Sequence, residues 1–301
     1  MITGFTVDAL LPPDMAARAE DLGLRKARLG VRRMFALAVL AGAFIALGAV
    51  FATTVTAGNI AIRPPDGSLA YSTGLPFGVN RLLGGVVFSL GLIPVIVGGA
   101  ELFTGNNLIV MAFASGKVTL HQLLRNWLVV YLGNFVGSIA TAIVVFLSGQ
   151  HVFPSGTGAI GLNMLNIGEA KTSLGFIEAV ALGLLCNTLV CLAVWLCFSA
   201  RSTTEKILSI IPPISAFVAA GFEHSAANMY FIPVALFVKQ WGNAAFFEAI
   251  HATASDFPHL TWGNFLLANL LPVTLGNIIG GALMVGLVYW FVYLRKPVSP
   301  P

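Results

Sequence analysis

Two stretches of the sequence decide the fold: Ala100-Glu101-Leu102-Phe103-Thr104-Gly105-Asn106 and Phe222-Glu223-His224-Ser225-Ala226-Ala227-Asn228. Each places an asparagine five residues after a glutamate, within a long apolar region that is otherwise uncharged. Because a charged residue is costly in the hydrocarbon core of a membrane, a glutamate at such a place marks a special structural feature.

The uncharged segments on either side of each glutamate are short, covering 82–100 and 102–116 in the first case and 207–222 and 224–238 in the second. A membrane-spanning helix needs about 20 apolar residues, so a half-length segment cannot cross alone. Two halves joined around one glutamate can. The sequence therefore predicts two spans, 82–113 and 207–238, that are interrupted near their middles.

Four further spans are predicted from the long uncharged stretches, at 34–57, 123–147, 176–200 and 262–294. The order long, interrupted, long then occurs twice. Asn126 and Asn134 in the third span have the same spacing as Asn269 and Asn277 in the sixth. We infer an internal repeat, 34–147 and 176–294, whose two copies are inverted because each holds three spans. The fold class is thus an all-α membrane protein of six transmembrane helices, with the second and fifth broken.

The composition excludes an ordinary soluble domain. Of the 301 residues, 57% are hydrophobic and only 9% are charged, whereas soluble domains carry about 25% charged residues. The mean hydropathy is +0.89. The net charge of +4 is typical of the excess of Lys and Arg in cytoplasmic loops. No basic run is interleaved with aromatic residues, so nucleic acid is excluded as a partner and membrane lipid is expected.

The distribution of basic residues predicts the orientation. With both termini in the cytoplasm, twelve of the 16 Lys and Arg residues fall on the cytoplasmic side, as the positive-inside rule requires. Residues 1–33 form a cytoplasmic segment with a short helix starting at Pro12-Pro13-Asp14, where Asp14 is the expected N-cap. Two interpretations of this helix remain open: it lies on the membrane surface, or it plugs the cytoplasmic mouth of a path. Residues 34–294 form the six-helix domain and 295–301 a cytoplasmic tail.

The two breaks indicate a path for a polar solute. Irregular backbone at membrane depth is tolerated where it lines a cavity, and paired interrupted spans in an inverted repeat point to a substrate site. The half-helix after each break presents unpaired N–H groups, which favour an anion. The side chains that can cap or line these ends are those of Thr104, Asn106, Ser225 and Asn228. The carboxylates of Glu101 and Glu223 are expected to hold the loops by accepting hydrogen bonds from the N–H groups of the breaks.

His224 is the histidine that lies inside a predicted span, beside Glu223. Ionisable residues within membrane spans are usually functional, and a histidine can both donate a hydrogen bond and change its charge near neutral pH. We expect His224 to carry the function of the path, with Glu223 beside it. Phe88, Leu92 and Phe217 precede the breaks and are either ordinary packing residues or a constriction.

Nothing in the sequence predicts an enzyme, a metal site or a cofactor. No His, Cys and carboxylate residues recur at metal-ligand spacing, and no nucleophile stands beside a base. Cys186, Cys191 and Cys197 lie within one apolar stretch and are expected to be small packing residues.

Four motifs resemble the formate–nitrite transporter family. They are Gly84-Gly85-Val86-Val87-Phe88-Ser89-Leu90-Gly91-Leu92, Gly99-Ala100-Glu101-Leu102-Phe103-Thr104, Gly221-Phe222-Glu223-His224-Ser225-Ala226-Ala227-Asn228-Met229 and Pro272-Val273-Thr274-Leu275-Gly276-Asn277-Ile278-Ile279-Gly280-Gly281. The resemblance runs from about residue 8 to residue 296. Val7-Asp8-Ala9-Leu10-Leu11-Pro12 and Leu75-Pro76-Phe77-Gly78 are most similar to the formate channel branch.

This resemblance implies an aquaporin-like six-helix protomer in the inner membrane, assembled as a homopentamer with one path in each protomer. It places Thr104 and His224 opposite each other at the centre of the path. It implies that Lys171 and Asn187 attract the anion and hold His224. It also assigns the apolar constrictions to Phe88, Leu92, Leu102, Val190 and Phe217.

The expected function is a channel for formate, coupled to a proton through His224. Nitrite and hydrosulfide channels share the same motifs and remain alternatives. A water or glycerol channel is a weaker alternative, because such channels have Asn-Pro-Ala at their half-helix starts whereas this chain has Asn106-Asn107-Leu108 and Asn228-Met229-Tyr230.

Overall fold

The computed structural model describes residues 9–58, 60–62 and 71–295. Val7 and Asp8 of the formate-branch motif and residues 296–301 of the expected tail lie outside this part. The elements follow in the order α1 (Pro12–Ala27), α2 (Val31–Thr56), β1 (Ile60–Ile62), β2 (Tyr71–Thr73), α3 (Phe77–Phe88), η1 (Ser89–Gly91), α4 (Leu92–Gly98), α5 (Phe103–Asn106), η2 (Asn107–Ile109), α6 (Val110–Ala114), α7 (Leu120–Leu147), η3 (Gln150–Val152), α8 (Ala159–Thr172), α9 (Phe176–Ser199), α10 (Thr203–Ala220), α11 (Ser225–Trp241), α12 (Ala244–Ala249), η4 (Ala254–Asp256), η5 (Asn264–Leu270), α13 (Leu271–Ile278), η6 (Ile279–Leu287) and α14 (Val288–Tyr293).

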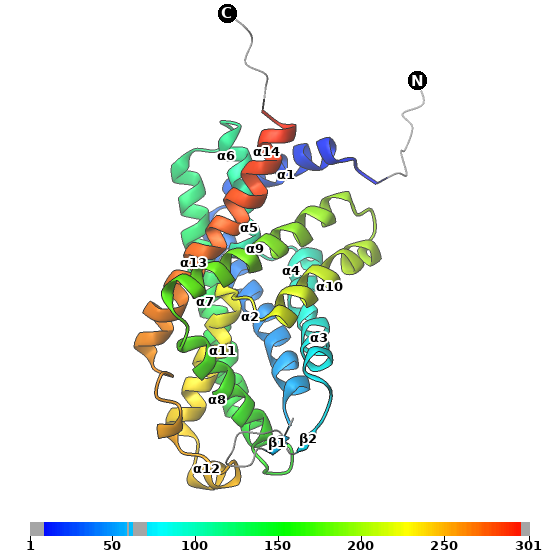
Figure 1. The fold of residues 1–301 in the computed structure, drawn as a ribbon. Helices are drawn as coiled ribbons and strands as arrows, with labels where there is room; N and C mark the ends of the chain where they lie inside the picture. Colours follow the sequence, from blue (N-terminus) through cyan, green and yellow to red (C-terminus); the bar gives the residue numbers. More distant parts are fainter. Residues whose placement is uncertain (1–8, 59, 63–70, 296–301) are drawn as a thin grey trace, which may run out of the picture.

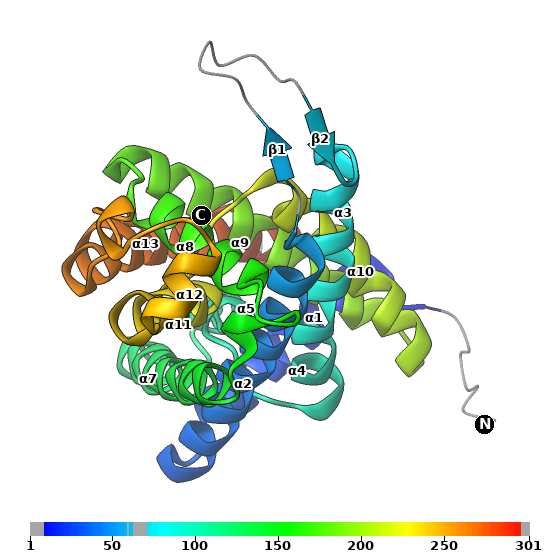
Figure 2. The ribbon, with the colours of Figure 1, turned by 90° about the horizontal axis from the view of Figure 1, so that it is seen from below.

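The molecule is a helical bundle, as predicted, and its described β-structure is one antiparallel hairpin, β1–β2. Helices α1 and α14 lie at one end, the terminal end, whereas the hairpin and α12 lie at the other, the hairpin end (Figure 1). Seen from the hairpin end, the long helices pack around the centre of the bundle, and the hairpin projects beyond their outline (Figure 2).

Among the described residues, five helical segments are long and apolar enough to span a membrane: Val31–Thr56, Phe77–Gly98, Leu120–Leu147, Phe176–Ser199 and Asn264–Tyr293. A sixth span is the pair Thr203–Ala220 and Ser225–Trp241, which is bent by 51° at its break. The segment before the first break, Phe77–Gly98, is long enough to cross alone. Its helix begins at Phe77, whereas the charge pattern placed the start of the span after Arg81, at residue 82. It is followed by the short apolar segment Phe103–Ala114.

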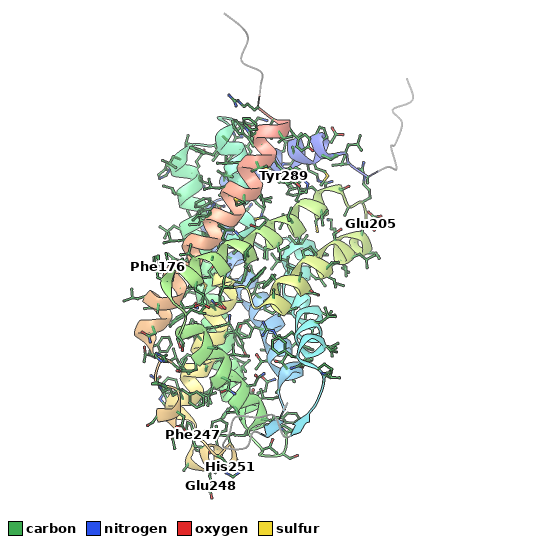
Figure 3. All side chains as sticks on the ribbon, viewed as in Figure 1. Phe176, Glu205, Phe247, Glu248, His251 and Tyr289 are labelled. Atoms are coloured by element: carbon green, nitrogen blue, oxygen red, sulfur yellow. The ribbon has the colours of Figure 1, made fainter. Side chains whose placement is uncertain are left out.

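The outer surface of the bundle carries many exposed apolar side chains. Phe176, 52% exposed, projects from the flank, whereas the charged Glu248 lies at the hairpin end (Figure 3). An exposed phenylalanine on the flank of a helical bundle is suited to contact with lipid or a neighbouring subunit. This distribution agrees with the spans assigned by length and hydropathy.

Both breaks are built in the same way. Helices α4 and α10 end at glycines in the left-handed conformation, Gly99 at φ 77° and Gly221 at φ 78°. Only glycine adopts this conformation without a steric penalty, and it is a common helix terminator. The chain then passes in extended conformation through Leu102 (ψ 127°) and His224 (ψ 112°) before α5 and α11 begin.

Small residues let the long helices of each half approach closely. A Cβ atom added at Gly137 of α7 would overlap the Val39 carbonyl oxygen of α2, and one added at Gly276 of α13 would overlap the Val180 carbonyl oxygen of α9. Close backbone approach at glycine is a typical device of membrane bundles. The α2–α7 and α9–α13 pairs are therefore equivalent, which agrees with the predicted repeat.

We expect Gly137→Ala and Gly276→Ala to destabilise the bundle similarly, because either methyl group must push two backbones apart. Overpacking of this kind costs about 1–3 kcal/mol. Thermal unfolding of the purified protein in detergent checks this, and a midpoint equal to that of the wild type would contradict it. Gly78→Ala is the matched control, since a Cβ there meets nothing within 4 Å.

Two helices were incompletely predicted. Helix α1 begins at Pro12 but its N-cap is Leu11, and Asp14 lies in the first turn rather than at the cap, where its charge still favours the helix dipole. Helix α8 was not predicted at all, because its 14 residues are too few to span a membrane. It packs through Ile160, Met164 and Leu165, which are buried.

Helix α1 packs against the bundle at the terminal end rather than only covering its surface. Its Ala16, Ala19 and Ala27 are buried, and the Arg18 guanidinium donates to the Phe198 carbonyl at 3.1 Å. Lys117 forms an ion pair with Glu20 of this helix, and that hydrogen bond raises the pKa of Lys117. Lys117 therefore stays charged at neutral pH, which keeps this anchor in place.

Candidate functional site

The two breaks meet at a hydrogen bond between Thr104 and His224. The Thr104 Oγ1 and His224 Nε2 atoms are 2.9 Å apart, and both side chains are buried. His224 is also the N-cap of α11, because its Nδ1 accepts the Ala227 N–H at 3.1 Å. A neutral imidazole whose Nδ1 accepts carries its proton on Nε2, so His224 donates to Thr104. The Thr104 hydroxyl proton is left for another acceptor.

Two asparagines hold the breaks with matching contacts. Asn134 Oδ1 accepts the Phe103 N–H at 2.9 Å, and its Nδ2 donates to the Glu101 carbonyl at 3.0 Å. Asn277 Oδ1 accepts the Ser225 N–H at 2.9 Å, and its Nδ2 donates to the Glu223 carbonyl at 3.0 Å. These amides replace the helical hydrogen bonds that each break has lost.

The N–H groups after the breaks are consequently less free than the sequence predicted. Asn134 and Asn277 occupy those of Phe103 and Ser225, and the His224 ring occupies that of Ala227. Fewer backbone donors are therefore left to face a solute than predicted, and the side-chain hydrogens of Thr104 and His224 lie beside them.

Each buried glutamate is neutralised by a lysine. Glu223 Oε1 lies 2.6 Å from Lys171 Nζ, at the end of α8. Glu101 Oε1 lies 2.9 Å from Lys26 Nζ, at the end of α1. A buried carboxylate is costly unless it is paired and hydrogen-bonded. The break glutamates are thus held by lysines, whereas we had predicted that they accept the N–H groups of the loops.

The asparagines that follow these glutamates complete two equivalent networks. Asn106 Nδ2 donates to Glu101 Oε2 at 2.7 Å and to Asn126 Oδ1 at 2.9 Å. Asn228 Nδ2 donates to Glu223 Oε2 at 2.6 Å and to Asn269 Oδ1 at 2.7 Å. The glutamate-to-asparagine spacing recognised in the sequence therefore reflects a direct side-chain contact.

Lys26 is a site residue that the sequence analysis missed. It stands five residues before Val31, where α2 begins, just as Lys171 stands five residues before Phe176, where α9 begins. This shared spacing is visible in the sequence, but both lysines lie outside the predicted repeat, whose copies start at residues 34 and 176. Helices α1 and α8 are therefore corresponding parts of the two halves.

Asn187 touches the Thr104 loop rather than His224. Its Nδ2 lies 3.3 Å from the Thr104 carbonyl, 2.9 Å from Asn107 Oδ1 and 2.6 Å from the Asn277 carbonyl. The expectation that Asn187 holds His224 is therefore corrected, since Thr104 lies between them. Asn187 ties the first break to the sixth span.

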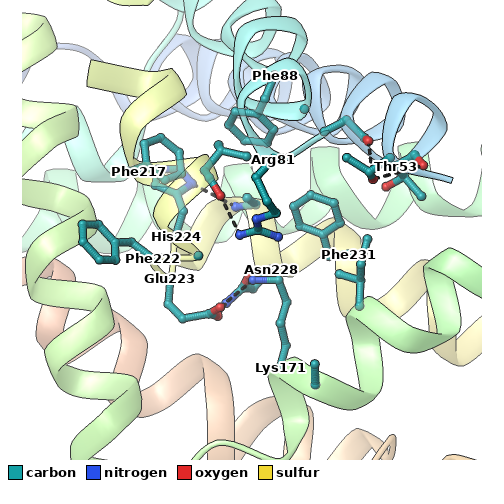
Figure 4. A pocket seen from close by; sticks show the side chains of 18 of the residues that line it. Thr53, Arg81, Phe88, Lys171, Phe217, Phe222, Glu223, His224, Asn228 and Phe231 are labelled. Carbon is teal, nitrogen blue, oxygen red and sulfur yellow. Dashed lines mark hydrogen bonds and ion pairs between the residues drawn. The ribbon is translucent and has the colours of Figure 1, made fainter. Parts of the chain in front are cut away.

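Two cavities approach this centre from opposite ends. The hairpin-end cavity, of about 370 Å³, is lined by Phe88, Phe217, His224, Lys171 and Glu223 (Figure 4). The terminal-end cavity, of about 290 Å³, is lined by residues that include Leu92, Leu102, Glu101 and Lys26, together with Arg18 of α1. Helix α1 thus lines the mouth of this cavity, which favours the second interpretation of the helix.

Four of the five predicted constriction residues line one or the other of these cavities. Phe88 contacts Phe217 edge to face at a centroid distance of 5.7 Å, and Phe217 stacks on the His224 ring at 5.8 Å. Leu92 and Leu102 stand on the terminal-end side. Val190 is buried but lines neither cavity.

Comparison with known proteins places the chain in a family. The family model described as "Formate/nitrite transporter" matches residues 13–291. The chain belongs to this family. The formate channel FocA of Escherichia coli K12 is 46% identical over 290 residues, covering 96% of each chain. FocA of Haemophilus influenzae is 40% identical over 278 residues, covering 92% of this chain and 93% of the other.

Two solved structures of this kind are similar to the fold. A pentameric formate channel with formate bound has a TM-score of 0.79 and 44% identity, and the match covers 88% of this chain and 98% of the other. An ion channel of the formate/nitrite transporter family has a TM-score of 0.73 and 27% identity, with 93% and 98% covered. Together with its apolar helices, family membership makes this chain a multi-pass membrane protein.

The formate/nitrite transporter motifs do not include every residue that lines the path. Phe231 stacks on Phe88 at 6.3 Å and lies beneath Lys171 Nζ, 5.5 Å from its ring centroid. Arg81 also lines the hairpin-end cavity. Within the described ranges, no three His, Cys, Asp or Glu residues are grouped to hold a metal ion.

Proposed function

We propose that this chain is a formate channel of the inner membrane, with both termini in the cytoplasm. It assembles as a homopentamer with one path in each protomer, and it catalyses no chemical conversion of its substrate. The observation that carries this proposal is the Thr104–His224 hydrogen bond. His224 lines the hairpin-end cavity, and Leu102 and Gly105, on either side of Thr104 in the sequence, line the terminal-end cavity. The names of the similar FocA proteins and the formate-bound pentamer support the choice of formate and the pentamer.

Both cavities carry a net positive charge that favours an anion. The charged residues lining the hairpin-end cavity are Arg81, Lys171 and Glu223, two cations against one carboxylate. The terminal-end cavity has Arg18, Lys26 and Lys206 against Glu101, three cations against one carboxylate. Clefts with one prevailing sign of charge concentrate ions of the opposite sign. Lys171 and Lys26 thus serve as attracting charges as well as partners of the break glutamates.

The constriction then selects a small solute. An anion loses hydration worth several kcal/mol when it enters an apolar passage, and Phe88, Phe217 and Leu92 provide no polar group to replace it. The Thr104 hydroxyl, whose oxygen accepts the His224 Nε2–H, provides one free donor at this depth. A carboxylate that displaces this contact receives both hydrogen bonds, one at each of its oxygens.

We further propose that a proton travels with formate through His224. Protonation of the ring places a second proton on Nδ1, which must then give up the Ala227 N–H. The capped, neutral ring is therefore the resting form, and an added proton is passed on through Nε2 to the carboxylate. Neutral formic acid then crosses the phenylalanine pair and leaves an uncharged ring that carries its proton on Nδ1. The cap re-forms once Nδ1 releases that proton and Nε2 takes one up.

Flux into proteoliposomes tests the proposal. With formate, nitrite, hydrosulfide and water measured side by side, we expect formate to pass fastest and nitrite more slowly. Water permeability should equal that of protein-free vesicles, which serve as the control. Uptake of nitrite or hydrosulfide without formate flux would assign the chain to another branch of the family, and water flux alone would refute the anion path.

A further inference from the structure

Arg81 is a half-buried cation whose place in the cavity has no assigned role. It belongs to α3 and lines the hairpin-end cavity together with Lys171 and Glu223. Its guanidinium extends into the space between Phe217 and Phe231 (Figure 4). Arginine keeps its charge under all ordinary conditions and donates through five N–H groups.

The charge of Arg81 is not cancelled by a carboxylate in the described part of the chain. Its Nη2 donates to the Val218 carbonyl at 2.6 Å and its Nε to the Ala219 carbonyl at 3.2 Å. Glu223 interacts with Arg81 electrostatically, but its close ion pair is with Lys171. The single carboxylate in this cavity is therefore committed to the lysine, and Arg81 accounts for the excess positive charge.

We propose that Arg81 forms an anion-binding site in the hairpin-end cavity, where a small monovalent oxyanion is held before it reaches the phenylalanine pair. This inference rests on the proposed function of the path. Nε and Nη2 face the end of α10, and Nη1 has no hydrogen-bond partner among the described residues, so its two hydrogens are available to a carboxylate. The carbonyl contacts fix the guanidinium in place, so an anion binds without having to order a flexible side chain.

A purely structural role offers a different explanation of the same contacts. The carbonyls of Val218 and Ala219 stand at the C-terminal end of α10, where a cation also offsets the helix dipole. The two roles depend on different properties of the side chain. Anion binding depends on the charge, whereas the cap depends on the two hydrogen bonds.

Arg81→Gln and Arg81→Lys separate these properties. Glutamine removes the charge but can still donate to a carbonyl, whereas lysine keeps the charge but lacks the planar fork. Saturation of formate flux is measured in oriented membrane vesicles, once from the hairpin side and once from the terminal side. A binding site in one cavity fills from the side to which that cavity opens. The half-saturating formate concentration measured from each side therefore reports the affinity of the site on that side.

For Arg81→Gln we expect the half-saturating formate concentration on the hairpin side to rise about 3- to 10-fold. The value on the terminal side should stay within about twofold. Arg81→Lys should restore most of the affinity on the hairpin side. Added inert salt should weaken binding in the wild type and in the lysine variant much more than in the glutamine variant, because salt screens the charge.

Lys239→Gln is the matched control. Lys239 is another cation near the hairpin end that donates to two backbone carbonyls, those of Phe257 and Leu260, but it does not line the cavity. Its removal should leave both half-saturating concentrations unchanged. Size-exclusion chromatography verifies that each variant assembles like the wild type.

The outcomes distinguish this inference from the proposed function. If the wild type passes formate and Arg81→Gln saturates at the wild-type concentration, the anion site is refuted and the channel stands. If both substitutions reduce the maximal rate or the assembly equally, Arg81 is a structural cap and the inference is also refuted. If the wild type passes no formate, the proposed function itself fails.

Discussion

The variant His224→Asn is expected to conduct formate without the component of import that acid stimulates. Asparagine is a favoured N-cap residue, so its Oδ1 can accept the Ala227 N–H as His224 Nδ1 does. Its amide can donate towards Thr104, but it cannot carry a proton at physiological pH. The fold and the anion leak should therefore persist while the coupling of anion to proton is lost.

The expected effect is large. General acid catalysis by a positioned side chain contributes on the order of 100-fold or more, so acid-driven uptake should fall by about that factor. Initial formate uptake into proteoliposomes is measured with and without an inward proton gradient. Proton-linked import at the wild-type level in His224→Asn would reduce His224 to a hydrogen-bond donor and refute the relay.

His121→Asn provides the matched control for this experiment. His121 lies exposed in the first turn of α7, away from both cavities. The same substitution there should change neither the rate nor its response to acid. An effect as large as that at His224 would show that the measured response does not arise in the path.

The two breaks could be located from the sequence because their cause is electrostatic. A glutamate within an apolar segment must have partners, and the repeated asparagine five residues later gave a second copy of the pattern. Both asparagines do contact their glutamates. The pairing of each glutamate with a lysine was not predicted, because Lys26 and Lys171 lie on helices outside the predicted spans, far from the glutamates in sequence.

The roles of individual polar groups were harder to predict than their presence. The N–H groups of the half-helices were expected to face the solute, because a helix start exposes unpaired donors. In the folded chain, Asn134, Asn277 and the ring of His224 take several of them. The two asparagines come from distant spans, so only the tertiary structure could reveal which of these N–H groups are taken and that the side chains of Thr104 and His224 meet beside them.

The apolar constriction was predicted in composition but not in arrangement. Phe88, Leu92 and Phe217 were recognised by their positions before the breaks, with core or lipid-facing packing as the default explanation and a constriction as the alternative. The contacts show that Phe217 joins two neighbours, since it meets both Phe88 and the ring of His224. Phe231 was missed because an apolar residue within a span carries no signal that separates a cavity wall from lipid.

The largest structural effect is expected from Asn134→Leu and Asn277→Leu. Leucine has a similar size but cannot donate or accept, so each substitution orphans one N–H and one C=O group of a break. At about 1–2 kcal/mol for each buried unpaired group, the loss is roughly 2–4 kcal/mol. This corresponds to a fall of roughly 5–10 °C in the midpoint of thermal unfolding.

Comparison of these two variants also tests the equivalence of the halves. The distances around Asn134 and Asn277 match, so the two unfolding midpoints should fall by similar amounts in detergent. Asn264→Leu is the control, because Asn264 is half-buried and its amide donates to the His259 carbonyl in an exposed contact outside the breaks. Formate flux should fall in both asparagine variants, since each loop positions one member of the Thr104–His224 pair. A normal midpoint and normal flux in either variant would mean that this break is held by other contacts, because two orphaned groups at this depth have no water to replace the lost amide.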